Sequence, residues 1–89
     1  MVTFIFTKKS EQIFRKLPSN IQNRILEKLH ELKSHVDIFV VLKRLHDFEP
    51  ATHRLRIGNY RLILELKKEL KQNREFWVLD VGHRRDIYR

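Results

Sequence analysis

The chain has 89 residues, of which 42% are hydrophobic and 34% are charged, and this composition is typical of a single globular domain covering residues 1–89. It contains no cysteine, which excludes a disulfide framework, a thiolate metal site and a cysteine nucleophile. The longest apolar run, residues 38–42, is far shorter than the roughly 20 residues of a membrane span, and no signal peptide is visible. We therefore expect a cytoplasmic protein with no membrane partner.

The net charge of +8 favours a polyanionic partner, either a nucleic acid or an acidic protein segment. Residues 1–50 carry nine basic and six acidic side chains, whereas residues 51–89 carry ten basic and five acidic ones. The basic side chains of the second group are mainly arginines, whose planar guanidinium binds phosphate and stacks on bases. This bias indicates RNA or DNA, and the alternative is a basic surface that serves only solubility.

The N-terminal half predicts a strand followed by two helices. Residues 2–6 are β-branched and aromatic, which favours a strand. Thr7 can cap a short helix that runs to Leu17 and is ended by Pro18.

A second helix is predicted to open at Ser19, because Ser19 and Gln22 have the spacing of a capping box. Residues 37–50 stay open between a helix extension, a strand and an apolar connector. The apolar positions of the second helix have the three-and-four spacing of an amphipathic face and comprise Ile21, Ile25, Leu29, Leu32 and Val36. The charged positions fall mainly outside this face and are expected to be solvated, namely Arg24, Lys28, Glu31 and His35.

The C-terminal half changes to the period of two that strands have. Residues 52–57 and 60–67 read as two strands joined at Gly58-Asn59, a strong hairpin signal. Residues 66–74 are predicted to be a charged turn region, and residues 75–82 a further strand. The expected fold is α+β, with a small antiparallel sheet of about four strands and two N-terminal helices packed on one face.

Alternation along the hairpin separates arginine from leucine. Leu55 shares one face with Ile57 and with His53, and we expect this face to pack on the helices. The opposite face then gathers three arginines, which a folded protein tolerates best when an anion lies among them. The alternative is ordinary solvent-side arginines, each paired with an acid such as Glu65 or Asp80. The three arginines are Arg54, Arg56 and Arg61.

The tail of residues 83–89 adds further groups that suit phosphodiester chemistry. His83 can titrate near neutral pH, and Tyr88 can stack on a nucleotide or donate a proton. The cations of the tail are Arg84, Arg85 and Arg89. The alternative is a frayed basic terminus. The remaining histidines lack metal-ligand spacing, and the sequence calls for no metal or cofactor.

Two segments carry a family resemblance. Residues 54–63 (Arg-Leu-Arg-Ile-Gly-Asn-Tyr-Arg-Leu-Ile) and 81–88 (Val-Gly-His-Arg-Arg-Asp-Ile-Tyr) closely resemble the RelE/ParE toxin superfamily. The shared pattern is an Arg-x-Arg strand, a Gly-x-Tyr-Arg turn, and a closing Val-Gly-His-Arg segment that ends in tyrosine.

The resemblance to RelE-like members implies a toxin of a type II toxin–antitoxin system, an mRNA interferase that cuts messenger RNA in the ribosomal A site. It implies metal-free attack by the RNA's own 2′-hydroxyl, contacts to 16S rRNA, and a complex with an acidic antitoxin. By position, Arg61 and Arg84 resemble the arginines that stabilise the scissile phosphate, and Tyr88 resembles the C-terminal tyrosine. Arg54 and Arg56 match basic strand positions that bind RNA.

One departure from the pattern affects the proton chemistry. RelE carries lysines along this strand, whereas the present chain has Thr52 and two arginines, and arginine cannot act as a general base. His83 or a carboxylate such as Glu49 is then required. Two alternatives remain, a ParE-like inhibitor of DNA gyrase and an inactive member that only binds RNA or its antitoxin.

Overall fold

The computed structural model describes residues 1–71 and 73–87, and for residues 86 and 87 the backbone alone. The described chain forms one five-stranded sheet with the strand order β1-β5-β4-β3-β2. β1 pairs in parallel with β5, and the other neighbours are antiparallel. The strands are β1 (Val2–Phe6), β2 (Leu42–Arg44), β3 (His53–Ile57), β4 (Tyr60–Leu70) and β5 (Asn73–His83). The helices are α1 (Lys8–Arg15), α2 (Ser19–Leu32), the 3₁₀ turn η1 (Ile38–Val40) and α3 (Arg84–Ile87).

The α+β fold class is confirmed, with one strand more than expected. The additional strand is β2, which comes from the ambiguous segment 37–50 together with η1. β2 has only three residues, and periodicity cannot identify an element that short. The Gly58-Asn59 hairpin between β3 and β4 is confirmed by the pairing of Ile57 with Tyr60.

The two helix starts differ in how well the sequence predicted them. Thr7 caps α1 as expected, because its Oγ1 accepts a hydrogen bond from the Ser10 backbone N–H at 3.1 Å. The capping box at Ser19 is wrong, since α2 has no side-chain cap. The Gln22 amide instead donates to the Leu17 carbonyl at 2.9 Å, so it satisfies the end of the preceding helix. Val36 lies beyond the end of α2 and is 96% exposed.

The predicted turn at residues 66–74 is also wrong. β4 continues to Leu70 and β5 begins at Asn73, so the two strands form a long ribbon. Its charged residues are stabilised across the strands, as in the pair of Arg74 Nε with Glu69 Oε2 at 3.2 Å. The charged residues of segment 66–74 therefore predicted a turn, although they form an exposed β-ribbon.

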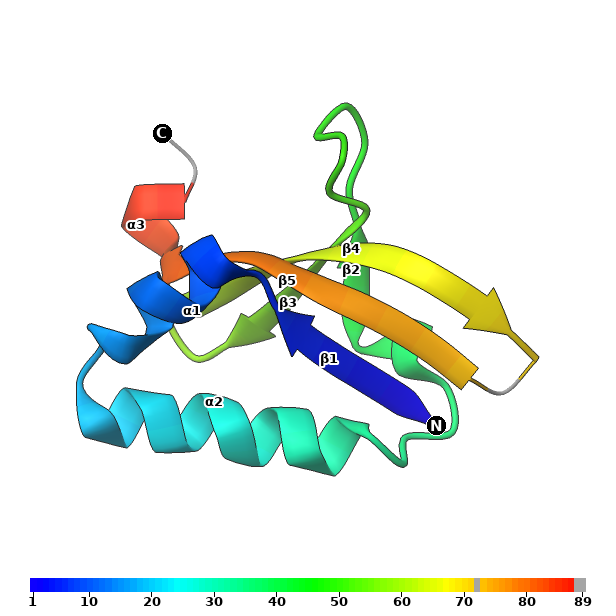
Figure 1. Ribbon diagram of the computed structural model, residues 1–89, viewed down its shortest axis with the longest axis horizontal. Helices are drawn as coiled ribbons and strands as arrows, with labels where there is room; N and C mark the ends of the chain where they lie inside the picture. Colours follow the sequence, from blue (N-terminus) through cyan, green and yellow to red (C-terminus); the bar gives the residue numbers. More distant parts are fainter. Residues whose placement is uncertain (72, 88–89) are drawn as a thin grey trace.

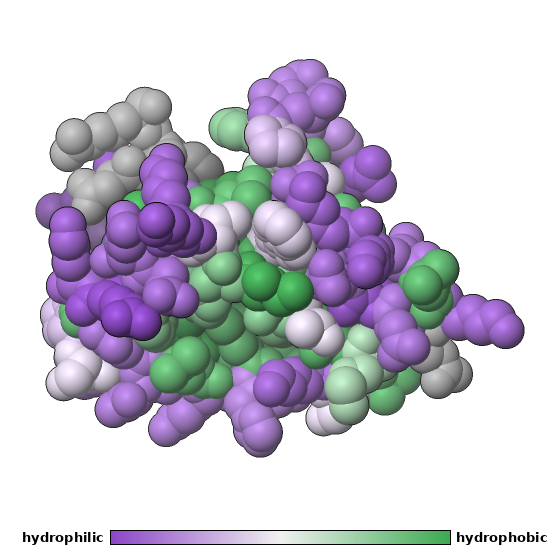
Figure 2. Space-filling view, in the orientation of Figure 1, coloured by the Kyte–Doolittle hydropathy of each residue, from purple (hydrophilic) through white to green (hydrophobic). Residues whose placement is uncertain are grey.

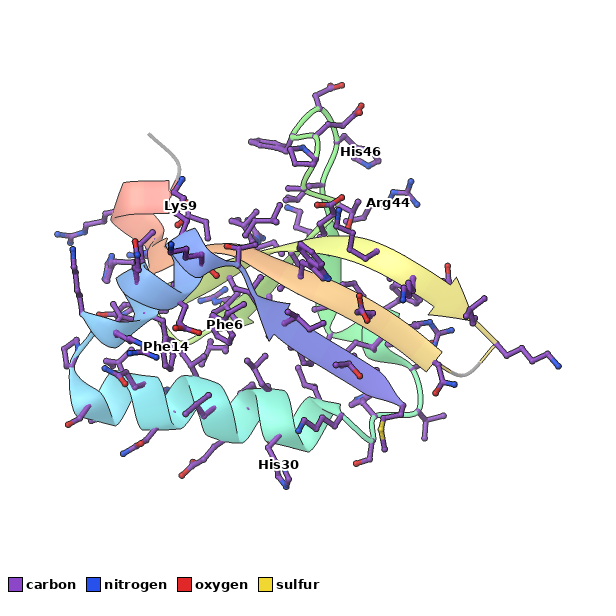
Figure 3. The ribbon with its side chains drawn as sticks, viewed as in Figure 1. Phe6, Lys9, Phe14, His30, Arg44 and His46 are labelled. Carbon is purple, nitrogen blue, oxygen red and sulfur yellow. The ribbon has the colours of Figure 1, made fainter. Side chains whose placement is uncertain are left out.

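The hydrophobic core lies between the sheet and the two N-terminal helices. Ile25 of α2 and Leu62 of β4 are fully buried, and each such side chain stabilises the fold by about 1.5–3 kcal/mol. Phe6 and Phe14 point toward each other, with ring centroids 5.1 Å apart, and thereby attach α1 to the end of β1 (Figure 3). Figure 2 shows hydrophobic side chains gathered between β1 and the helices, and mostly hydrophilic ones on the loop of residues 45–52.

The sheet has one covered and one open side. α2 runs along one side, whereas the loop of residues 45–52 and α3 stand on the other (Figure 1). The side opposite α2 is called the open face below. Among the helices that the structure describes, none is long and apolar enough to cross a membrane.

Candidate nucleic-acid interface

Three predicted arginines share the open face of the sheet. Arg56 of β3 is the direct cross-strand partner of Arg61 of β4, and Arg54 is the partner of Ile63. Leu55 points to the opposite side and is buried in the core. The separation of arginine and leucine faces that the alternation predicted is therefore confirmed.

α3 brings a fourth arginine to the same end of the sheet. The Arg84 backbone N–H donates to the Asn59 carbonyl at 2.8 Å, so α3 begins beside the β3–β4 turn. The side chains of Arg84 and Arg85 are exposed. We call Arg54, Arg56, Arg61 and Arg84 the arginine cluster. Tyr88 and Arg89 lie outside the described residues.

Arg61 is held rigidly inside this end of the sheet. Only 7% of its surface is exposed, although it lies on the open face. Its Nη1 donates to the carbonyls of Gly58 at 3.2 Å and Tyr60 at 3.1 Å. Its cross-strand partner on β5 is Gly82, which has no side chain to compete for the space. The guanidinium is thus fixed by its own turn before any ligand arrives.

Arg61 also has an unused donor. Its Nε is buried and has no hydrogen-bond partner among the residues that the structure describes. A buried donor without a partner costs about 1–3 kcal/mol, and more when the group is charged. Such a cost is offset when an anion accepts the hydrogen bond.

Among the residues whose side chains the structure describes, no acidic neighbour neutralises Arg56 or Arg61. Arg56 and Arg61 form no ion pair with another described residue. Glu65 pairs instead with Lys67, at 3.3 Å between Oε2 and Nζ. Asp80 is half-buried and its Oδ1 accepts from the Val81 backbone N–H at 2.9 Å. For these two arginines, the simple solvent-side pairing with Glu65 or Asp80 is absent in the described part of the chain.

His83 caps the C-terminal helix. Its Nδ1 accepts a hydrogen bond from the Arg85 backbone N–H at 3.3 Å, and its ring meets the Tyr60 ring edge-on at 5.6 Å. Because Nδ1 is an acceptor here, the neutral ring carries its proton on Nε2. The register pairs His83 with Tyr60, one position away from the pair of Gly82 and Arg61. Strand alternation therefore directs His83 away from the open face, at the edge of the arginine cluster.

His53 has the core position that the alternation predicted. It is 7% exposed, with its Nδ1 2.8 Å from Thr52 Oγ1 and its ring 5.4 Å from that of Phe39. Burial lowers the pKa of His53, and the positive charge of Arg44 lowers it further. This histidine is part of the core and lies on the opposite side of the sheet from its neighbour Arg54 and the rest of the arginine cluster.

Sequence reasoning missed Tyr60 and Arg24 near the cluster, and it considered Asp80 only as an ion-pair partner of the arginines. Tyr60 contacts His83, and Asp80 is the cross-strand partner of Ile63 on the open face. Arg24 of α2 lies against Gly58 of the turn. Periodicity assigned Arg24 to a solvated helix face, and only the packing of α2 beside the hairpin reveals its place. No group of three or more His, Asp or Glu residues placed to hold a metal ion occurs within residues 1–71 and 73–87.

The fold is similar to those of solved toxin–antitoxin structures. A chain of the RelBE2 toxin–antitoxin complex from Mycobacterium tuberculosis aligns with a TM-score of 0.73 and 26% identity, covering 91% of this chain and 95% of that one. The intact E. coli RelBE complex gives a TM-score of 0.62 and 24% identity, with 91% and 94% covered. The isolated E. coli RelE toxin gives 0.63 and 21%, with 91% and 82% covered. The fold is thus that of RelE-like toxins.

The family follows from the sequence match. The model of the family described as the ParE toxin of the type II toxin–antitoxin system, parDE, matches residues 4–88. The chain therefore belongs to this toxin family, within the RelE/ParE superfamily. No curated protein matches the sequence.

Proposed function

We propose that the chain is a ribosome-dependent endoribonuclease that cleaves mRNA in the A site and thereby inhibits translation. The observation that carries the proposal is the arginine cluster on the open face, in which Arg61 is buried with an unused donor. Guanidinium groups fixed in advance stabilise the charge that develops on a phosphate in the transition state. RelE-like architecture supports the same assignment.

The proposed reaction uses the RNA itself as nucleophile. The 2′-oxygen forms a bond to the adjacent phosphorus while the bond from phosphorus to the 5′-oxygen breaks, which leaves a 2′,3′-cyclic phosphate and a 5′-hydroxyl. Negative charge grows on the non-bridging oxygens, and Arg61 with Arg84 stabilises it. Arg54 and Arg56 bind the neighbouring backbone. The basic tail, with Arg85 and Arg89, adds further RNA contacts.

Two proton transfers complete the reaction. A general base must take the proton of the 2′-hydroxyl, and a general acid must give a proton to the departing 5′-oxygen. His83 suits the role of the acid when its ring is protonated, because the imidazolium at the edge of the arginine cluster can give a proton to the departing oxygen. Tyr88 stacks on a base or shares this role. Two carboxylates suit the role of the base, namely Asp80 on the open face and Glu49 in the loop of residues 45–52.

The proposed partner is an antitoxin with an acidic segment. The two RelBE matches are toxin–antitoxin complexes, and a negative segment on the open face would neutralise the arginine cluster. The proposed setting is the cytoplasm, where the toxin alternates between a heteromeric antitoxin complex and the ribosome. There its positive charge also favours contacts to 16S rRNA.

Purified chain added to ribosomes programmed with a defined mRNA tests the proposal. We expect primer extension to show a cut at the A-site codon, unchanged by EDTA, with products ending in a cyclic phosphate. The same mRNA without ribosomes is the control and should stay intact. A folded chain that leaves ribosome-bound mRNA intact, or that cuts only when divalent ions are present, contradicts the proposal.

A second candidate function is inhibition of DNA gyrase. It is favoured by the family match itself, because the matching model describes ParE toxins. Supercoiling of a relaxed plasmid by purified gyrase, with and without the chain, distinguishes the two. Loss of supercoiling while ribosomal mRNA stays intact supports the gyrase inhibitor.

A further inference from the structure

A cleft of about 320 Å³ lies between α2 and the end of β3. Its walls carry both signs of charge, and the lining residues are Arg24, Glu27, Lys28, Glu31, Arg56, Ile57 and Gly58. β2 does not cover this part of β3, because its pairing begins with Leu42 opposite Leu55. The cleft therefore opens at a bare sheet edge, directly beside the arginine cluster.

Arg24 lies flat against the β3–β4 turn. A Cβ atom added at Gly58 would be 3.2 Å from Arg24 Nη2 and 3.3 Å from its Cζ, so the missing side chain leaves room for the guanidinium. The carbonyl of the same glycine accepts the hydrogen bond from Arg61 Nη1. The turn is thus held between two guanidinium groups, Arg24 from the helix and Arg61 from the strand.

The cations of the cleft are incompletely matched. Lys28 Nζ pairs with Glu31 Oε1 at 3.7 Å. The remaining charged residues of the lining are two arginines, Arg24 and Arg56, and one carboxylate, Glu27. Neither arginine forms an ion pair with a residue that the structure describes. The lining of the cleft therefore includes two arginines and only one further carboxylate, Glu27, none of them in an ion pair with a described residue.

We propose that Arg24 and Arg56 bind a phosphate of the RNA that flanks the scissile one held by Arg61. The proposal rests on the proposed function and adds a second phosphate site to it. Guanidinium forks match the oxygens of a phosphate, and Arg56 belongs both to the cleft and to the open face, so one strand reaches both sites. Glu27 and Glu31 repel a further phosphate, which limits the cleft to one.

The test measures binding of a short oligoribonucleotide whose cut-site 2′-hydroxyl is replaced by hydrogen, so that it cannot be cleaved. Fluorescence anisotropy over a range of salt concentrations gives the slope of log K against log[salt] for the wild type, Arg24→Ala and Arg24→Lys. Arg15→Ala is the matched control, because Arg15 is an exposed helical arginine paired with Glu11 at 3.0 Å.

We expect Arg24→Ala to weaken binding about tenfold at low salt and to reduce the slope by about 0.7, the value for one contact to a single strand. Arg24→Lys retains the charge and most of the slope, and Arg15→Ala changes neither quantity. Glu27→Gln tightens binding without touching the turn, so it decides the question if Arg24→Ala fails to fold.

Three outcomes overturn the inference. If Arg24→Ala binds the RNA with the same affinity and salt slope as the wild type, the second phosphate site is ruled out and the proposed function is unaffected. The same holds if Arg24→Ala weakens only the binding of an acidic peptide, which assigns the cleft to a protein ligand. A wild-type chain that binds no free RNA at any salt concentration also overturns the inference, and cleavage on programmed ribosomes then tests the proposed function separately.

Discussion

The two ends of the open face differ in whether their basic side chains form ion pairs. At the end near the β3–β4 turn, Arg56 and Arg61 oppose each other and form no ion pair with a described residue. At the other end, Lys67 pairs with Glu65 at 3.3 Å, and its ammonium lies 4.7 Å from the centre of the Trp77 ring. β4 contributes to both ends, with Arg61 at one and Lys67 at the other, so a single strand carries both arrangements.

This difference supports an anion-binding role for the arginine end of the sheet. Like charges directly opposite each other on neighbouring strands destabilise a sheet, by up to about 1 kcal/mol per pair. At the Lys67 end the positive charge is paired with a carboxylate, as is usual on a sheet surface. The end with Arg56 and Arg61 keeps its unmatched charge and buries part of it, which suits a site that binds an anion.

The largest predicted effect concerns the RNA at the arginine end. An mRNA with a 2′-deoxynucleotide on the 5′ side of the cut lacks the attacking hydroxyl, so cleavage at that position should be abolished while binding is retained. Primer extension on programmed ribosomes measures the cut, and binding is measured in parallel. A cut at the deoxy position would show that another nucleophile, such as water, attacks.

The next effect sharpens the comparison between the two ends. Arg84→Ala removes one cation from the arginine cluster and should lower the single-turnover cleavage rate about 100-fold, the usual scale for one donor to developing charge. Lys68→Ala removes an exposed cation from the far end of β4 and should leave the rate unchanged. Equal losses in the two variants would mean that total charge, and not position, governs the reaction.

A smaller effect is expected from the turn that holds Arg61. Gly58 has a φ of 60°, so Gly58→Ala strains the backbone and should destabilise the fold by about 1–2 kcal/mol. Urea unfolding measures the free energy, with Asn59→Ala as the neighbouring control that lacks a positive φ. If both variants lose the same stability, the positive φ is not the cause.

The smallest effect is a pH dependence that has its origin in the core. Burial holds the pKa of His53 below its usual 6.5 in the folded state, so the unfolded chain takes up the proton first. The stability that the neutral ring provides is therefore complete above pH 6.5 and is lost as the pH falls through the lowered pKa. His53→Phe should show a smaller loss of unfolding free energy between pH 7.5 and 5. An identical loss in both proteins would assign the effect to other groups.

Local patterns predicted most of the fold and the face of the sheet on which the arginines of the candidate site lie. The alternation of leucine and arginine in residues 54–64 sorted the two faces of the hairpin, and Gly58-Asn59 located its turn. These features depend on neighbours in sequence, so they can be read from the chain alone. The family resemblance agreed with them and is confirmed by the family match over residues 4–88.

Features that depend on distant contacts could not be predicted. The charges of residues 66–74 suggested a turn because their cross-strand partners were unknown, and Arg24 seemed solvated because nothing local connects it to Gly58. The burial of Arg61 was missed for the same reason, since alternation gives a side chain's face and not its exposure. The roles assigned to Tyr88 and Arg89 remain predictions outside the described residues.

We expect Arg61, which forms no ion pair with a described residue, to take part in the chemistry of the open face, and Lys67, which pairs with Glu65, to take no part. The most direct test compares Arg61→Ala with Lys67→Ala in single-turnover cleavage of mRNA on the same programmed ribosomes, after both variants are shown to be folded. Arg61→Ala should lower the rate about 10²–10³-fold. Lys67→Ala should cleave like the wild type. A folded Arg61→Ala variant with the wild-type rate, or one no slower than Lys67→Ala, would contradict the account.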